Sequence, residues 1–246
     1  MATDRSAKGS TMIGKSLLLG LALGILAGCA ARAASWQELD AQAQAHFDAG
    51  RFEEAADGWR RALAVAAEPA PPIEQSRLLD DLGFAYLEMG DTDSARIALE
   101  QALGLKESLL GQTDPRLVST LMQLAKIYSR TGNLTAAVDV AREVSTILDR
   151  NSAPGEGLDV RRQLATLLAT GKDFAESPTV RAEVMKLYDE VIDLQGELIG
   201  IGHPEMEELI REAEWLYNEW GMQEEAAFFR QEAEAIWQRA KQRKGW

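Results

Sequence analysis

The most reactive type of side chain in this sequence occurs once, as Cys29, among 246 residues. A thiolate is a nucleophile that can be alkylated, oxidised or joined to a second thiol. Because there is no second cysteine, an intramolecular disulfide is excluded. An apolar run over residues 17–25 lies shortly before Cys29, and Arg5, Lys8 and Lys15 precede that run. A basic segment, a short apolar segment and small residues before a cleavage site are typical of an export signal.

The four residues that end this segment resemble the lipobox of bacterial lipoproteins, and they are Leu26, Ala27, Gly28 and Cys29. In that family, diacylglycerol alkylates the cysteine sulfur, the preceding peptide bond is cut, and the new amino terminus is usually acylated. The resemblance implies that 1–28 is a lipoprotein signal peptide, that Cys29 is the lipidation site, and that 29–35 is a short tether. Ala30 stands where an aspartate would favour inner-membrane retention. The family rule therefore favours the periplasmic face of the outer membrane, with inner-membrane anchoring as the alternative.

Two other interpretations of the leader are open. A membrane-spanning helix needs about 20 apolar residues, whereas the apolar stretch over 16–30 is shorter and Arg32 follows it at once. An ordinary secretory signal would be cut after an Ala-x-Ala pattern, which residues 31–33 supply. Met12 is a second candidate start, because Lys15 and the apolar run follow it closely.

Composition limits the remaining classes of function. The chain has 26 Lys and Arg against 39 Asp and Glu, a net charge of −13. Nucleic-acid binding relies on Lys and Arg for phosphate contacts, so nucleic acid is not a predicted partner. Anionic membrane surfaces would also repel an acidic chain, so that membrane attachment would depend on a covalent lipid. The chain beyond the leader is long enough for one large domain or an extended array.

Glycines follow apolar, alanine- and leucine-rich stretches at intervals of 39 to 50 residues, at Gly50, Gly90, Gly132, Gly171 and Gly221. The stretches between them are rich in good helix formers. A period of this size is typical of a helical solenoid, in which each unit stacks on the next. A non-repetitive helical bundle is the alternative, since alanine-rich helices with periodic leucines can imitate repeats.

The clearest unit contains, in order, Leu82, Gly83, Tyr86, Gly90, Ala95, Leu99 and Ala102. It resembles the tetratricopeptide repeat (TPR), with its Leu-Gly-x-x-Tyr motif, its turn glycine and its later alanine. The pattern gives each position a task. Gly83 lets the two helices of a hairpin approach closely, Leu99 fills the space between them, and Gly90 makes the turn.

A second internal match joins 99–132 to 188–221 without gaps, at an offset of 89 residues. Within it, Leu-Gly-x-x-Asp114-Pro corresponds to Ile-Gly-x-x-His203-Pro. We expect Asp114 and His203 at helix N-caps, with proline at the first helical position. Units of about 42 residues with this joint resemble the long TPR variant of kinesin light chains.

The predicted fold class is therefore all-α, a TPR solenoid of about five antiparallel helix pairs in a right-handed superhelix. We predict a repeat domain over 36–246, with units near 36–67, 74–110, 115–149, 157–199 and 204–241. The fourth unit fits the pattern least well, and residues 173–178 are interpreted as an inserted loop.

Residues that could perform catalysis do not form a recognisable motif. There is no Cys/His metal spacing and no phosphate-binding glycine loop, so we predict no enzyme activity, no metal and no cofactor. His46 occupies the tyrosine position of the first unit and is expected to be a packed residue. His203 is expected to cap a helix.

The first helix of each pair lines a concave groove in TPR arrays, and the resemblance assigns candidate partner-binding residues to it. They are Asp40, Gln44, Phe47, Arg77, Asp80, Phe84, Leu87, Ser119, Met122, Lys126, Arg211, Trp215 and Asn218. This mixture of charged and apolar groups suits a protein or peptide partner. TPRs that clamp a C-terminal carboxylate carry asparagine where this chain has Gln44, Phe84, Lys126, Ala165 and Trp215, so that mode is not favoured.

The sequence thus predicts a non-enzymatic, lipid-anchored scaffold of the bacterial cell envelope. It would bind a protein or peptide partner and support the assembly or regulation of an envelope complex. Two alternatives stay open. One is an accessory subunit of an envelope enzyme in cell-wall or secretion machinery, and the other is a soluble TPR adaptor with a fortuitous leader.

Overall fold

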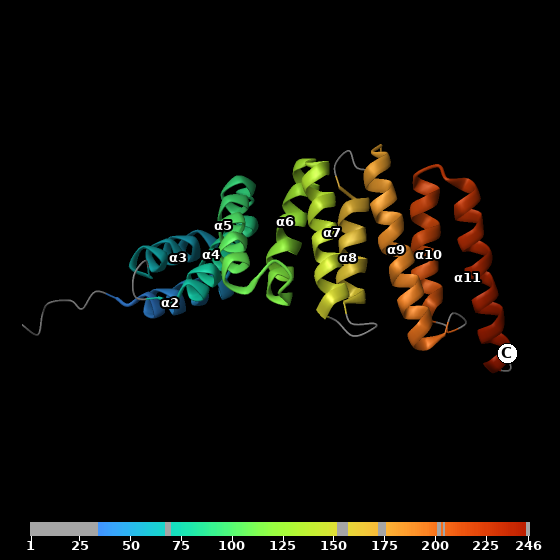
Figure 1. Cartoon of the computed structure of the whole chain (residues 1–246), viewed down its shortest axis with the longest axis horizontal. Helices are drawn as coiled ribbons and strands as arrows, with labels where there is room; N and C mark the ends of the chain where they lie inside the picture. The colour runs from blue at the N-terminus through green and yellow to red at the C-terminus, as the bar shows by residue number, and fades with distance from the viewer. Residues whose placement is uncertain are drawn as a thin grey trace, which may run out of the picture.

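The computed structural model describes residues 34–66, 70–151, 157–171, 176–200, 203 and 205–244, which form ten α-helices, one short 3-10 helix and no strand. The bounds are α2 Trp36–Asp48, α3 Phe52–Ala66, α4 Pro72–Met89, α5 Thr92–Leu110, η1 Pro115–Leu117, α6 Val118–Thr131, α7 Leu134–Asn151, α8 Leu158–Ala169, α9 Pro178–Ile199, α10 Glu205–Glu219 and α11 Gln223–Lys244. Successive helices stand side by side along an elongated molecule (Figure 1). The predicted all-helical solenoid is confirmed.

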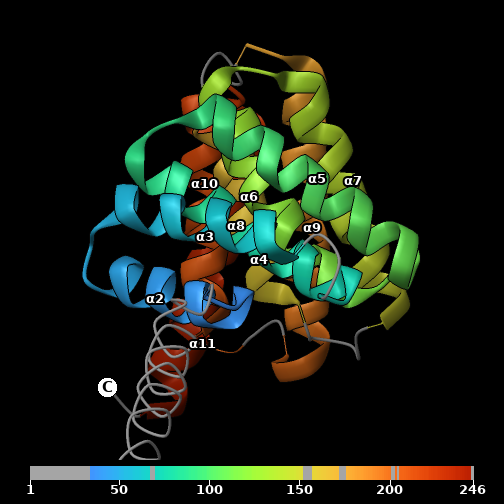
Figure 2. The same ribbon diagram turned by 90° about the vertical axis from the view of Figure 1, so that its left-hand side faces the viewer.

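The helices form five hairpins, which are α2–α3, α4–α5, α6–α7, α8–α9 and α10–α11. Contacts between neighbouring hairpins keep two layers in register, because α6 touches α8 while α7 touches α9. The first helices of the third and fourth hairpins therefore form one face, and their second helices form the other. The end-on view shows the N-terminal helices α2 and α4 crossing in front of the later ones (Figure 2).

The turn within each hairpin depends on the repeated glycine. Gly90 ends α4 in the left-handed conformation, with φ of 79°, and its N–H donates to the carbonyl of Leu87. A side chain is disfavoured there, which explains a glycine at this position. Gly50, Gly132 and Gly221 have the same sign of φ, whereas α8 ends at Thr170 with φ of −98° and Gly171 is not in this conformation. The fourth hairpin thus departs from the turn that the spacing predicts.

Close helix contact within the second hairpin depends on Gly83. A Cβ atom built on Gly83 would lie 2.6 Å from Cγ of Leu99, which is fully buried. The first hairpin has a similar contact, since a Cβ on Gly58 would lie 2.7 Å from Cβ of Ala43. The predicted role of Gly83 in close approach is confirmed.

The joint between hairpins is the same in the two matched segments. Gly111 and Gly200 both have positive φ, of 88° and 86°. Asp114 caps the helix that follows the first joint, because its Oδ1 accepts from the N–H of Arg116 at 2.9 Å. At the second joint, Nδ1 of His203 accepts from the N–H of Glu205 at 3.3 Å. The capping prediction for Asp114 is confirmed. His203 makes the hydrogen bond expected of a capping side chain, and Pro204, the predicted first helical residue, lies outside the described residues.

The buried core is divided into two clusters. The smaller one joins α2 and α3 to most of α4 and to Ala98 of α5, and it includes Trp59 and Leu78. The larger one begins with Leu87 and Leu99 and continues to Ile236. Tyr86, which is partly buried, packs against both clusters. The border between the two cores therefore lies inside the second hairpin.

His46 differs from its prediction as a packed residue. It is half-buried, and its Nδ1 accepts a hydrogen bond from Nε of Arg51 at 2.9 Å. Phe47, which is also half-buried, packs against the smaller core instead, with its ring centroid 5.7 Å from that of Trp59. Leu39 and Ala43 set the buried stripe of α2, and Phe47 lies one helical turn beyond Ala43 on that stripe.

Candidate binding groove

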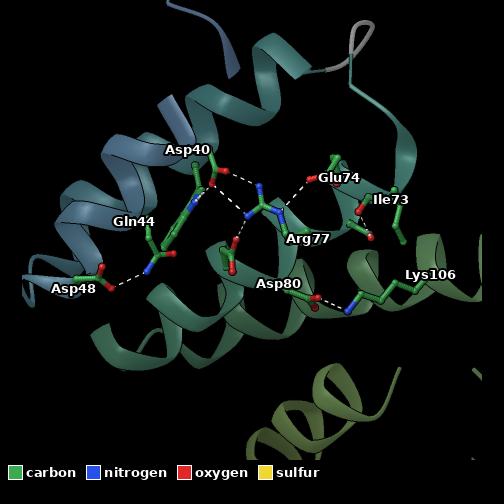
Figure 3. Close-up of polar contacts among 11 residues, drawn as sticks. Asp40, Gln44, Asp48, Ile73, Glu74, Arg77, Asp80 and Lys106 are labelled. Carbon is green, nitrogen blue, oxygen red and sulfur yellow. Dashed lines mark hydrogen bonds and ion pairs between the residues drawn. The ribbon is translucent and has the colours of Figure 1, made fainter. Parts of the chain in front are cut away.

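Asp40 and Arg77, two of the predicted groove residues, bind each other. The guanidinium of Arg77 lies 2.5 Å from Oδ2 of Asp40, 2.7 Å from Oδ2 of Asp81 and 3.1 Å from Oε2 of Glu74 (Figure 3). Nε1 of Trp59 also donates to Oδ1 of Asp40 at 3.0 Å. This network fixes α2 against α4, so Asp40 and Arg77 hold the fold together at this end.

Burial raises the pKa of Asp81 to about 6, although the neighbouring Arg77 charge opposes the shift. The charges of Asp40 and Asp80 act in the same direction as burial. The cluster therefore concentrates three carboxylates around one guanidinium, and the raised pKa means that the folded state favours the protonated form of Asp81.

Asp80 is buried and lies away from any open surface. Its carboxylate forms an ion pair with Lys106 of α5 and accepts from Oγ1 of Thr120 in α6 at 2.8 Å. Lys106 in turn donates to Oγ1 of Thr120 at 2.8 Å. The expectation that Asp80 lines the groove is wrong, because its side chain is turned into the junction of α4, α5 and α6, where the carboxylate is paired.

Leu87 is also wrong as a groove residue, since it is buried in the larger core. Phe47 and Phe84 are half-buried against the cores and offer only part of their rings to a partner. Gln44 is exposed and donates to Oδ1 of Asp48 at 2.7 Å, and Ser119 is exposed at the start of α6. These residues do not meet at one cavity.

A groove opens between α6 and α8, with a volume of about 630 Å³. Its lining combines predicted and unpredicted residues, namely Met122, Gln123, Lys126, Asp159, Arg162, Gln163, Thr166 and Leu167. Met122 packs on the larger core, while the amide, hydroxyl and charged groups face the space. The groove therefore offers apolar walls with several polar groups, which is the usual composition of a recognition site.

Two cations in the groove have different environments. Nε of Arg162 donates to Oε2 of Glu212 in α10 at 2.9 Å, and Glu208 lies 3.5 Å from the same guanidinium. The hydrogen bond with Glu212 raises the pKa of Arg162. Lys126, in contrast, has no ion-pair partner among the residues that the structure describes. Its ammonium is available to an incoming carboxylate.

The last predicted residues lie on α10. Trp215 is 57% exposed, which is unusual for a side chain of its size. It follows Glu208 and Glu212 on one face of the helix, since seven residues bring a side chain back to the same face. Arg211 pairs with Glu207 at 2.9 Å, and Asn218 is half-buried. The ring of Trp215 thus lies on the same face of α10 as the two glutamates that contact Arg162 of the groove.

Sequence reasoning missed the contribution of α8 to this groove. The fourth unit fitted the repeat poorly, so no residue of α8 was selected. A usable signal was nevertheless present, because Asp159, Arg162 and Thr166 recur at helical spacing beside the buried stripe of Leu164 and Leu168. A polar stripe next to an apolar one marks the solvent-facing edge of a packed helix.

The predicted lipidation site lies outside the described residues, together with the motif of Leu26, Ala27, Gly28 and Cys29 and the first half of the predicted inserted loop over 173–178. Of the helices that are described, none is both long and apolar enough to cross a bilayer. Within the same residues, no three or more His, Cys, Asp or Glu side chains are grouped as a metal site would require.

The comparisons with known proteins agree with this architecture. Two overlapping segments, 32–108 and 74–150, match the sequence profile of the family described as tetratricopeptide repeat. The chain is similar in structure to a kinesin light chain protein of Podosopora anserina with nearly identical TPR-like repeats, at 19% identity and a TM-score of 0.64, over 83% of this chain and 96% of that one. No curated protein sequence matches the chain.

Two further solved structures are similar to the chain in fold. BtubC of P. vanneervenii has 16% identity and a TM-score of 0.60, over 94% of this chain and 89% of that one. MamA has 15% identity and a TM-score of 0.53, over 81% of this chain and 96% of that one. At such identities these likenesses show the fold alone. The predicted TPR repeats and their likeness to kinesin light chain repeats are confirmed.

Proposed function

We propose that this chain, which carries tetratricopeptide repeats, is a non-enzymatic scaffold that holds an acidic peptide segment of a partner protein in the groove between α6 and α8. The observation that carries the proposal is the groove of about 630 Å³ with the unpaired ammonium of Lys126 inside it, as far as the described residues show. The occupant follows from that charge, because a carboxylate would supply the missing counter-ion.

The polar groups around Lys126 suit a peptide backbone as well as a carboxylate. Gln163 and Thr166 supply amide and hydroxyl groups that can bond to main-chain N–H and C=O groups. Met122 and Leu167 give apolar contact on either side, and methionine adapts its shape to varied ligands. An exposed Trp215 further along the same face would anchor an apolar residue of the same segment.

A charge-reversal experiment tests this binding mode. Peptides that bind the purified chain over 34–246 would be selected from a random display library. Their charge would be compared, and their affinities would be measured by fluorescence anisotropy. We expect enrichment of acidic sequences, and at least about tenfold weaker binding to Lys126→Glu. Lys186→Glu on α9 is the matched control, because Lys186 lies outside the groove and is 58% exposed. Equal loss in both variants, or the absence of acidic sequences among the selected peptides, would refute the proposal.

We further propose that the scaffold is tethered by a lipid on Cys29 to the envelope of a bacterium, on the periplasmic side of the outer membrane. The support is the sequence alone: a lone cysteine directly after Leu26, Ala27 and Gly28, behind a short apolar run. A partner captured in the groove would then be held close to the membrane, which suits a role in assembling or regulating an envelope complex.

The anchor has its own test. The full-length chain would be expressed in a Gram-negative host with radiolabelled palmitate, beside the variant Cys29→Ala. Label on the unaltered chain and none on the variant is the expected result, with only the variant released by carbonate washing. If the variant stays in the membrane fraction after salt and carbonate, the lipid tether is wrong, and the groove proposal is unaffected.

A further inference from the structure

A second hollow lies at the C-terminal end of the molecule, away from the groove between α6 and α8. It has a volume of about 360 Å³ and is lined by Asp189, Ile192, Asp193, Ile210, Phe228, Phe229 and Glu232. Most of these residues belong to α9 and α11, the second helices of the last two hairpins. Figure 1 shows these helices with α10 between them. The hollow thus belongs to a different surface from the one that α6 and α8 form.

The apolar part of this hollow is exposed and held in place. Phe228 is 59% exposed, the highest value among the large apolar residues that the structure describes. Its ring meets that of Phe229 edge to face, with centroids 5.5 Å apart, and Phe229 lies 5.0 Å from Tyr217. An aromatic side chain fixed in this way loses little further freedom on binding, which favours a role as an anchor.

The polar part of the hollow is acidic throughout. Asp189, Asp193 and Glu232 surround the aromatic ring, and none of them has an ion-pair partner among the residues described. Burial, together with the nearby charge of Asp193, raises the pKa of Asp189. Burial and the charges of Asp189 and Glu225 raise the pKa of Tyr217 to about 12. Both shifts have the sign expected where negative charge is uncompensated.

We propose that this hollow is a docking site for a cationic amphipathic segment of a partner protein, whose apolar side chain covers Phe228 while its Lys or Arg side chains pair with Asp189, Asp193 and Glu232. The charge complementarity identifies the occupant. Three unpaired carboxylates around an apolar floor attract a segment that carries both positive charge and an apolar face. The site is independent of the groove that Lys126 lines.

Other occupants fit less well. The basic end of this chain begins at Arg239, seven residues after Glu232 on the same helix. It therefore lies about 10 Å further along the helix axis and leads away from the hollow. A second copy that presented the same face would bring three more carboxylates against the first three, which is unfavourable. An anionic membrane surface is repelled for the same reason.

The test uses two synthetic peptides of about 14 residues, one of Leu and Lys and one of Leu and Glu, each at amphipathic helical spacing. Binding to the chain over 34–246 would be followed by anisotropy of a dye on the peptide. We expect the Lys peptide to bind, and to bind more weakly as salt rises. The triple variant Asp189→Asn, Asp193→Asn, Glu232→Gln should weaken binding about tenfold or more, and Phe228→Ser should do so alone.

A matched control separates local from general electrostatics. The triple variant Glu54→Gln, Glu88→Gln, Asp93→Asn changes net charge by the same amount at exposed positions on α3, α4 and α5. It should leave the affinity for the Lys peptide within about twofold. The proposal fails if the Lys peptide does not bind, or if both triple variants weaken its binding alike. It also fails if Phe228→Ser instead abolishes self-association seen by light scattering.

Discussion

The buried triad of Asp80, Lys106 and Thr120 should respond to substitution in a characteristic way. Its two charged side chains are 9% and 10% exposed, so neither can recover solvation if its partner is removed. Lys106→Met leaves the Asp80 carboxylate with one hydrogen bond, from Thr120. Breaking a buried ion pair on one side typically costs about 3–5 kcal/mol, because the remaining charge stays desolvated. We expect a loss of unfolding free energy in that range.

Replacing the whole triad should restore most of that loss. In the variant Asp80→Leu, Lys106→Met, Thr120→Val, no charge or hydroxyl is left to be desolvated, and the gap from the native chain should fall to within about 1–2 kcal/mol. The comparison between single and triple variants thus separates the cost of an orphaned charge from the cost of lost packing.

The assay is urea unfolding followed by circular dichroism, with amide hydrogen exchange of α4, α5 and α6 as a second measurement. Exchange is needed because repeat arrays can unfold in more than one step. A loss below about 1 kcal/mol for Lys106→Met would show that water reaches the pair and would refute the argument. A triple variant less stable than the single one would refute it as well.

Two further predictions concern the same region. Gly83→Ala should destabilise the chain by about 1–2 kcal/mol, because overpacking against Leu99 outweighs the gain in helix propensity. Gly104→Ala, with no atom within 4 Å of its new Cβ, should stabilise the chain by up to about 1 kcal/mol in the same urea unfolding experiments. Equal effects of the two substitutions would contradict the proposed contact. Asp81 has a folded pKa of about 6 against an ordinary 3.8, so the folded state holds the extra proton between these values. The titration of Asp81 therefore makes the free energy of unfolding fall as pH rises from about 4 to 6, by at most about 3 kcal/mol. The fall should be smaller in Asp81→Asn. If that variant has the same pH profile of stability as the unaltered chain, Asp81 is not the group responsible.

Features that depend on local geometry could be predicted from the sequence. Gly90 turns a helix end and Gly83 permits close approach, and both requirements leave a residue type at a fixed spacing in the chain. Asp114 and His203 cap helices through atoms two residues away, which is equally local. The all-helical solenoid follows from these positions, because each unit repeats the same short-range constraints.

The candidate site was less predictable because its chemistry depends on distant pairs. Asp40 and Arg77 are 37 residues apart, and Asp80 and Thr120 are 40 apart, so nothing local shows that each satisfies the other. The sequence alone does not show whether a charged side chain at a groove position is already paired within the chain or is free to bind a partner. Lys126 could be selected by position, whereas its lack of a partner became visible only in three dimensions.

The division of the core at Tyr86 has a consequence for how disturbances spread along the molecule. Apolar contacts tie the first hairpin, most of α4 and Ala98 of α5 into one cooperative block. They tie Leu87, Leu99 and the buried apolar residues of the later helices into another. The walls of the groove draw their support from the second block, to which Met122 and Leu164 belong. Loosening of α2 and α3, by heat or by tension on the chain before Ser35, is therefore absorbed in the first block. The binding face is insulated from whatever holds or pulls the N-terminal end.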